Sequence, residues 1–182
     1  MKKLLVIVDM VNGFVKEGAL ADPKINQITP NIISKINEYL ENSLPIISFR
    51  DCHKTNDIEF NTFPPHCIKG TSESNLIDEL KPFEDYFIDI EKDTTNGYNT
   101  DAFKNYISNN TFDIIEVTGC CTDICVETFA LSLKEFFKEN NISTEIVVIE
   151  NAVFTFDSPT HNADQMHRKS IEKMRNNGII IK

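Results

Sequence analysis

The sequence lacks an apolar segment long enough to cross a membrane, and it has few basic residues for its length. A membrane-spanning helix needs roughly 20 consecutive apolar residues, and charged residues interrupt each apolar run here well before that. The 18 lysines and arginines stand against 28 acidic residues, which gives a formal net charge of −10. A surface of this sign repels phosphate backbones. These absences argue against a membrane protein and against a nucleic-acid partner.

The chain also lacks a regular framework of paired cysteines. Its five cysteines are an odd number, whereas small secreted domains carry an even number at regular spacings. The basic and apolar N-terminus stops at Asp9, and no small-residue cleavage site follows, so it predicts a first strand better than a signal peptide. We therefore expect reduced thiols and a cytoplasmic location.

What the sequence does contain is an alternation of β-branched apolar runs with amphipathic segments. We expect strands at 3–9, 44–49, 85–92, 112–119, 143–151 and 178–182, and helices at 29–42, 74–81, 100–109, 123–139 and 161–177. This alternation predicts an α/β fold with three α/β/α layers around a mostly parallel central sheet. Without repeats or flexible linkers, residues 1–182 are expected to form a single domain.

Reactive residue types follow four of the predicted strands. Asp9, residues 50–53, Lys92 and residues 119–125 each stand at a strand end. In a parallel sheet the ligand site lies at the carboxyl ends of the strands. These segments are therefore expected to meet in one place.

Three of the five cysteines, Cys120, Cys121 and Cys125, lie where a strand gives way to a helix. With Thr122 or Asp123 as the cap, Cys125 would occupy the first helical turn. A helix N-terminus lowers the pKa of a thiol, and its N–H groups can hold an oxyanion. Cys125 thus has the setting of a nucleophile, although a small buried hydrophobe remains an open alternative for all three.

Asp9 and Lys92 are candidates to act on that thiol. A carboxylate at the end of a buried strand can serve as a base that takes the thiol proton and later activates water. Lys92 could stabilise both Asp9 and a thiolate by its charge. The alternatives are a turn aspartate and a solvated lysine.

The loop at 49–71 has the composition of a metal site. It contains Asp51, His53 and His66, with Glu59 between them. An Asp-x-His pair at an extended strand end places both side chains on one face. Imidazole and carboxylate ligands suit zinc, iron or manganese in the divalent state. A polar loop with satisfied histidines is the open alternative.

Together these segments resemble the nicotinamidase branch of the isochorismatase-like cysteine hydrolases, over nearly the whole chain. VIVDMVNGF (6–14) is similar to the opening strand of that family, and RDCH with FPPHCIKGT to its metal loop. IEK (90–92) is similar to the strand that ends in the catalytic lysine, and VTGCCTDICVETFA to the nucleophile segment. The resemblance implies an isochorismatase-like hydrolase fold.

The resemblance assigns roles to particular residues. Asp9, Lys92 and Cys125 would be the catalytic residues. The backbone N–H groups of Cys121 and Cys125 would form the oxyanion hole, and the peptide bond between Cys120 and Cys121 would be cis. The sulfur atoms of Cys120 and Cys121 would have no catalytic role.

The family resemblance also implies a cofactor. Asp51, His53, His66 and, in some members, Glu59 would hold one divalent metal ion. Zinc is the first candidate, with iron and manganese as alternatives. The metal would anchor the pyridine nitrogen of the substrate and would not activate the nucleophile.

The implied reaction is hydrolysis of nicotinamide to nicotinate and ammonia through a cysteine thioester, as in NAD salvage. Phe14 and Phe63 would sandwich the ring, and Tyr98 could supply a further aromatic side chain. The expected partner is a small aromatic amide, and a homo-oligomer is left open.

Three departures from the family pattern bear on the substrate. Val11 and Gly13 stand where Gln and Asp are usual, and Phe63 replaces a tryptophan. The first alternative is therefore a metal-free hydrolase of the same superfamily that acts on another small amide or ureido compound. The second is a catalytically silent binding module of the same fold.

Overall fold

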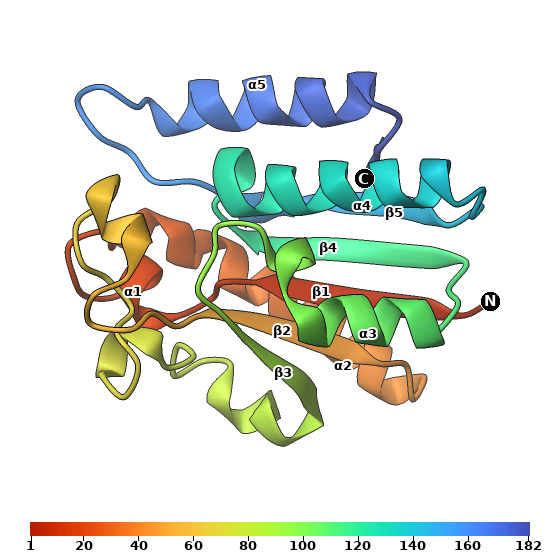
Figure 1. Cartoon of the computed structure of the whole chain (residues 1–182), viewed down its shortest axis with the longest axis horizontal. Helices are drawn as coiled ribbons and strands as arrows, with labels where there is room; N and C mark the ends of the chain where they lie inside the picture. Colours follow the sequence, from red (N-terminus) through yellow and green to blue (C-terminus); the bar gives the residue numbers. More distant parts are fainter.

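The computed structural model describes residues 1–182 as a parallel sheet between two layers of helices (Figure 1). The strands are β1 (Lys3–Val8), β2 (Ile46–Asp51), β3 (Phe87–Lys92), β4 (Ile114–Cys120), β5 (Glu145–Phe154) and β6 (Ile180–Ile181). The α-helices are α1 (Asn12–Val15), α2 (Thr29–Glu41), α3 (Asp101–Asn109), α4 (Glu127–Glu139) and α5 (Ala163–Asn176). A π-helix, η6 (Thr122–Val126), joins β4 to α4. None of the helices has the length and apolar character that a bilayer crossing requires.

The two faces of the sheet bury separate apolar clusters because side chains alternate along each strand. On β1, Leu4, Val6 and Val8 face the cluster completed by α3, α4 and α5. Leu5 and Ile7 face the opposite cluster, which α2 completes. The central strand β1 is buried on both faces, which explains why it is continuously apolar.

The strand order is β3-β2-β1-β4-β5-β6, and all neighbouring strands are parallel. The order reverses between β1 and β4, and ligands of doubly wound sheets bind at the carboxyl ends beside such a reversal. Gly119 of β4 has φ +107°, and a Cβ atom there would lie 2.0 Å from the carbonyl oxygen of Val8. Only glycine therefore lets these two strands approach so closely at the site.

The predicted strands and most of the predicted helices are observed, and three of the differences lie close to the site. The helix expected at 74–81 is wrong: Leu76 forms a β-bridge with Val11, and the Ile77 N–H donates to the carbonyl of Met10. These tertiary contacts hold residues 75–77 extended, and a turn at 78–80 follows, despite the helical spacing of the segment. The four-residue helix α1 was not predicted, and α4 begins at Glu127 because the π-helix precedes it.

Candidate active site

The carboxyl ends of the first four strands bring the predicted catalytic residues together. Asp9 directly follows β1, and Lys92 is the last residue of β3. Cys125 lies in η6, just after β4. The loops that follow these strands gather at the end of the molecule away from the N-terminus (Figure 1).

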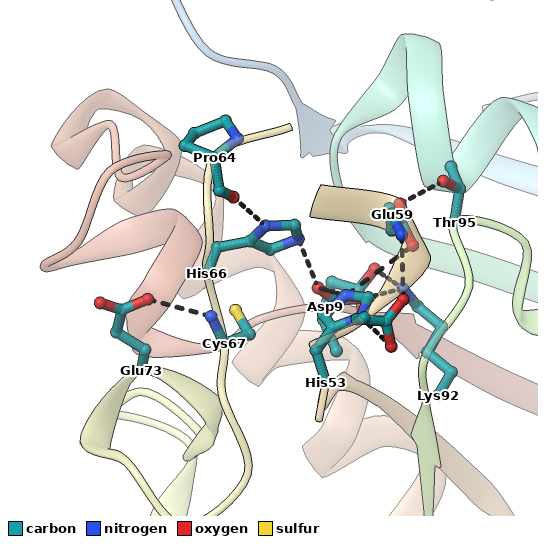
Figure 2. A network of polar contacts seen from close by, with 11 residues as sticks. Asp9, His53, Glu59, Pro64, His66, Cys67, Glu73, Lys92 and Thr95 are labelled. Atoms are coloured by element: carbon teal, nitrogen blue, oxygen red, sulfur yellow. Dashed lines mark hydrogen bonds and ion pairs between the residues drawn. The ribbon is translucent and has the colours of Figure 1, made fainter. Parts of the chain in front are cut away.

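Lys92 lies between two carboxylates in the interior. Its Nζ is 2.8 Å from Oδ2 of Asp9 and 2.6 Å from Oδ1 of Asp51. All three residues are buried, and the side chains of Asp9 and Lys92 have no exposed surface. Figure 2 shows Lys92 reaching from β3 toward this group. The contacts exclude the alternative of a solvated lysine, because a buried ammonium needs such partners.

Asp9 has the protonation behaviour of a general base. Burial raises its pKa from 3.8 to about 6, against the opposing effects of Lys92 and the neighbouring Cys125 thiol. Its Oδ1 atom is buried without a hydrogen-bond partner. A carboxylate with a pKa near neutrality and a free oxygen can accept and return a proton.

The surroundings of Cys125 differ from those expected of a helix first turn. Burial raises the pKa of its thiol well above the usual value, because the lowering effect of Lys92 does not compensate for burial and the nearby carboxylates. Neither Thr122 nor Asp123 caps the helix. The pKa of this thiol is therefore raised on balance and not lowered as expected, and the thiol needs a base to ionise. The expected cis peptide bond between Cys120 and Cys121 is confirmed.

A second cluster adjoins the first through Asp51. Oδ2 of Asp51 lies 2.9 Å from Nε2 of His53 and 3.0 Å from Nε2 of His66. One ligand atom from each residue falls within 4.8 Å of the others, and all three residues are buried. Lys92 and both histidines outweigh the effect of burial and hold the pKa of Asp51 below its usual range. The carboxylate thus stays ionised, as a metal ligand must.

The outer contacts of these histidines also fit a metal site. Figure 2 shows Nδ1 of His66 next to the carbonyl oxygen of Pro64, at 2.8 Å. Nδ1 of His53 lies 3.2 Å from Oδ2 of Asp57. Such contacts orient each ring so that Nε2 faces the metal. The donor set and the convergence of the Nε2 atoms fit a divalent transition metal.

Glu59 lies at the edge of this cluster. Its Oε1 accepts a hydrogen bond of 2.7 Å from the Thr95 hydroxyl, and its Oε2 is 3.8 Å from Nε2 of His53. It stands outside the group of three residues whose ligand atoms converge. The arrangement leaves Asp51, His53 and His66 as the inner set.

A pocket of about 280 Å³ opens onto both clusters. Its walls include Cys125, Asp51 and His66, together with the aromatic rings of Phe14 and Phe63. The volume is near the lower end of the range for small-molecule sites. The pocket therefore fits a compact ligand that contacts the thiol and the histidine cluster together.

Tyr98 does not line this pocket, and its predicted place in the substrate site is wrong. Its ring packs against Phe103 and Phe136, at centroid distances of 6.3 and 5.8 Å. Phe156, by contrast, lines the pocket and was not predicted. It comes from the loop after β5, which belongs to the closing strand-and-helix segment of the family resemblance, but no functional residue was predicted there.

Comparison with known proteins places the chain in a family. The Isochorismatase domain model matches residues 3–181. Nicotinamidase 1 of Arabidopsis thaliana is 33% identical over 176 residues, which cover 87% of this chain and 72% of that protein. A crystal structure of a nicotinamidase from Bacillus subtilis has a TM-score of 0.84 and 26% identity, and covers 100% of this chain and 99% of its own.

The pyrazinamidase of Pyrococcus horikoshii, solved in complex with zinc, shares the fold with a TM-score of 0.83. It is 23% identical and covers 100% of this chain and 99% of its own. The family model spans nearly all of the sequence, and the structural matches extend over the whole fold. The chain belongs to the isochorismatase family.

Proposed function

We propose that this protein is a metal-dependent cysteine amidohydrolase that converts nicotinamide to nicotinate and ammonia. The observation that carries the proposal is one pocket lined by Cys125 and by two members of the Asp51, His53 and His66 cluster. The similarity to nicotinamidases supports the amide substrate. Asp9 and Lys92 adjoin the Cys125 thiol. Asp9 supplies the base, and Lys92 supplies the positive charge that offsets the thiolate.

The first half of the reaction forms a thioester. Asp9 takes the proton of the Cys125 thiol, and the sulfur attacks the amide carbonyl carbon. The pKa of the thiol lies well above that of Asp9, so the proton transfer is expected to accompany the attack of the sulfur and not to precede it. Lys92 stays protonated and offsets the negative charge that passes between them.

The tetrahedral intermediate carries its negative charge on the former carbonyl oxygen. The backbone N–H groups of Cys121 and Cys125 are placed in the proposal as its donors. Both residues line the pocket, and the cis bond turns the chain just before the π-helix. Donors fixed in a water-poor site stabilise such an oxyanion more strongly than water does.

The second half releases the products. When the C–N bond breaks, the leaving nitrogen takes a proton from Asp9 and departs as ammonia. Asp9 then removes a proton from a water molecule, which attacks the thioester carbonyl. The sulfur leaves and takes that proton back from Asp9 to become the thiol, and the acid product loses its own proton to solvent as nicotinate. The residues thereby return to their starting protonation states.

Asp51, His53 and His66 would hold the metal, with zinc as the first candidate. When bound, the metal supplies a Lewis-acidic point of attachment for the pyridine nitrogen. Phe14 lies 5.7 Å from the His66 ring and Phe63 lies 6.2 Å from it, between ring centroids. Both rings therefore flank the place where an aromatic substrate would lie.

The test is ammonia release from nicotinamide by protein that has been treated with a chelator and then reloaded with zinc. We expect activity in the reloaded protein and a KM raised by roughly tenfold to a hundredfold in the chelated one. Hydrolysis of another small amide without metal would favour the metal-free alternative. Absence of activity on nicotinamide and on an amide panel would reject the enzyme.

A further inference from the structure

The loop between β5 and α5 forms one wall of the pocket and is held in place by polar contacts with another loop. Phe156, Asp157 and Ser158 of this loop line the pocket. The Asp157 N–H donates to Oδ2 of Asp22 at 2.8 Å, and its side chain accepts from Lys24 at 2.8 Å. These contacts connect the wall to the loop that carries Asp22, and Asp22 also lines the pocket.

His161 lies behind Phe156. The two rings are stacked with their centroids 3.9 Å apart and their planes at 8°. Nδ1 of His161 lies 2.9 Å from the carbonyl oxygen of Phe156, so the histidine contacts both the ring and the backbone of that residue. These contacts fix the angle at which Phe156 faces the pocket.

The other nitrogen of His161 reaches the segment that carries the nucleophile. Nε2 lies 2.8 Å from Oδ2 of Asp123, and Asp123 is two residues before Cys125 in the same π-helix. The second oxygen of Asp123 is buried and has no hydrogen-bond partner. His161 is therefore the one side chain that holds this carboxylate.

We propose that His161 is a positioning residue that fixes the aromatic wall and the nucleophile relative to each other. The proposal rests on the amidase function above. Through Phe156, His161 sets the surface against which a substrate ring lies. Through Asp123, it sets the position of the Cys125 sulfur. A ring-bearing amide seated against Phe156 would then meet a thiol at a fixed distance, whereas a ligand without a ring would gain nothing from this link.

His167 provides a matched control. Its Nδ1 lies 3.0 Å from the hydroxyl of Thr122, so it also contacts the π-helix. Its nearest aromatic neighbour is Phe154, at 5.6 Å, which does not line the pocket. His167 thus has the contact with the nucleophile segment without the contact with the wall.

The test separates the two contacts of His161. His161→Phe keeps a ring against Phe156 but loses both polar contacts, so kcat should fall roughly tenfold with little change in KM. His161→Gln keeps a donor for Asp123 but loses the stacked ring, so KM should rise about threefold with a smaller change in kcat. His167→Phe should leave KM unchanged.

A merely structural role would lower the active fraction of both variants without this split. Wild-type kcat and KM in both His161 variants, or the same loss of kcat in both with KM unchanged, would overturn the proposal. Phe156→Leu gives a second route, since it should raise KM while leaving the contact between His161 and Asp123 in place.

A further readout does not depend on the substrate. Alkylation of Cys125 by iodoacetamide, corrected with the Cys125→Ala variant, should slow roughly tenfold in His161→Phe. If the wild type released no ammonia, the proposed function would fail while this rate still tested the role of His161. An unchanged alkylation rate in that case would overturn the positioning role as well.

Discussion

Two clusters of buried charge lie on this sheet, and they differ in what surrounds them. At the carboxyl ends, Asp9 pairs with Lys92 beside the pocket. Halfway along β4, on the face covered by α2, Glu116 accepts from Lys35 at 2.8 Å and from the Tyr39 hydroxyl at 3.1 Å. Both clusters bury a carboxylate against an ammonium, so burial and pairing alone do not distinguish them.

The difference lies in unused hydrogen-bonding capacity and access to the pocket. Asp9 keeps an oxygen without a partner and adjoins a pocket-lining thiol. Neither oxygen of Glu116 is a buried atom without a partner. A buried charge whose neighbours are only structural partners stabilises a fold, whereas one with a free atom beside a pocket-lining thiol is available for chemistry.

The largest effect is expected from Asp9→Asn. The amide keeps the shape of the side chain but cannot take the thiol proton, so kcat/KM for nicotinamide should fall roughly 10³-fold. Glu116→Gln is the matched variant in the other cluster and should retain activity within about twofold. Comparable losses in both variants would remove the distinction between the clusters.

The second-largest effect on activity is expected from a change of pH. In the proposed mechanism the base is ionised Asp9, whose pKa is raised to about 6, so the rate should fall about tenfold per pH unit below that value. The contribution of Asp9 to stability has the opposite sign: it is present below pH 3.8 and is lost as the pH rises through about 6.

The pH profile of kcat/KM measures the first of these effects. Glu116→Gln should give the same profile as the wild type, because its cluster has no part in proton transfer. A rate that stayed constant from pH 7 to pH 5 would contradict the role of Asp9.

A smaller effect is expected from Asp57→Asn, outside the metal cluster. The change weakens the contact that orients His53, so zinc affinity should fall roughly tenfold. Competition with a chromogenic chelator measures that affinity. The control is Asp78→Asn, which removes an exposed carboxylate paired only with Lys81 and should change nothing. Equal affinities in the two variants would show that Asp57 has no orienting role.

The smallest effect on activity, and a distinct effect on stability, is expected from Glu116→Gln. Loss of the charge weakens the pair with Lys35 and the bond from Tyr39, at a cost of about 1–2 kcal/mol in the free energy of unfolding. Urea denaturation measures this loss. An unchanged free energy of unfolding would mean that the Glu116 cluster on β4 does not stabilise the fold.

The strand ends of the site could be predicted from the sequence because two strong rules apply to them. Buried parallel strands appear as continuous apolar runs, and their carboxyl ends meet at one edge. Asp9 and Asp51 follow or end such runs, Lys92 ends the edge strand β3, and the structure brings all three into contact.

The remaining features depend on contacts between distant segments. His161 meets Asp123 across 38 positions of the chain, and no local pattern signals that pair. Tyr98 is close along the chain to residues expected in the site, but its ring packs against the apolar cluster beside α3 and α4. The pKa of Cys125 is raised mainly by burial, which the sequence around the thiol does not reveal.

The most direct measurement is ammonia release from nicotinamide by the zinc-loaded wild type and by Cys125→Ala, with circular dichroism to verify that both are folded. The wild type should release ammonia and nicotinate in equal amounts, and Cys125→Ala should be slower by on the order of 10⁴-fold or more. Equal rates in the two proteins, or no release by the wild type, would contradict the assignment of Cys125 as the nucleophile of a nicotinamide hydrolase.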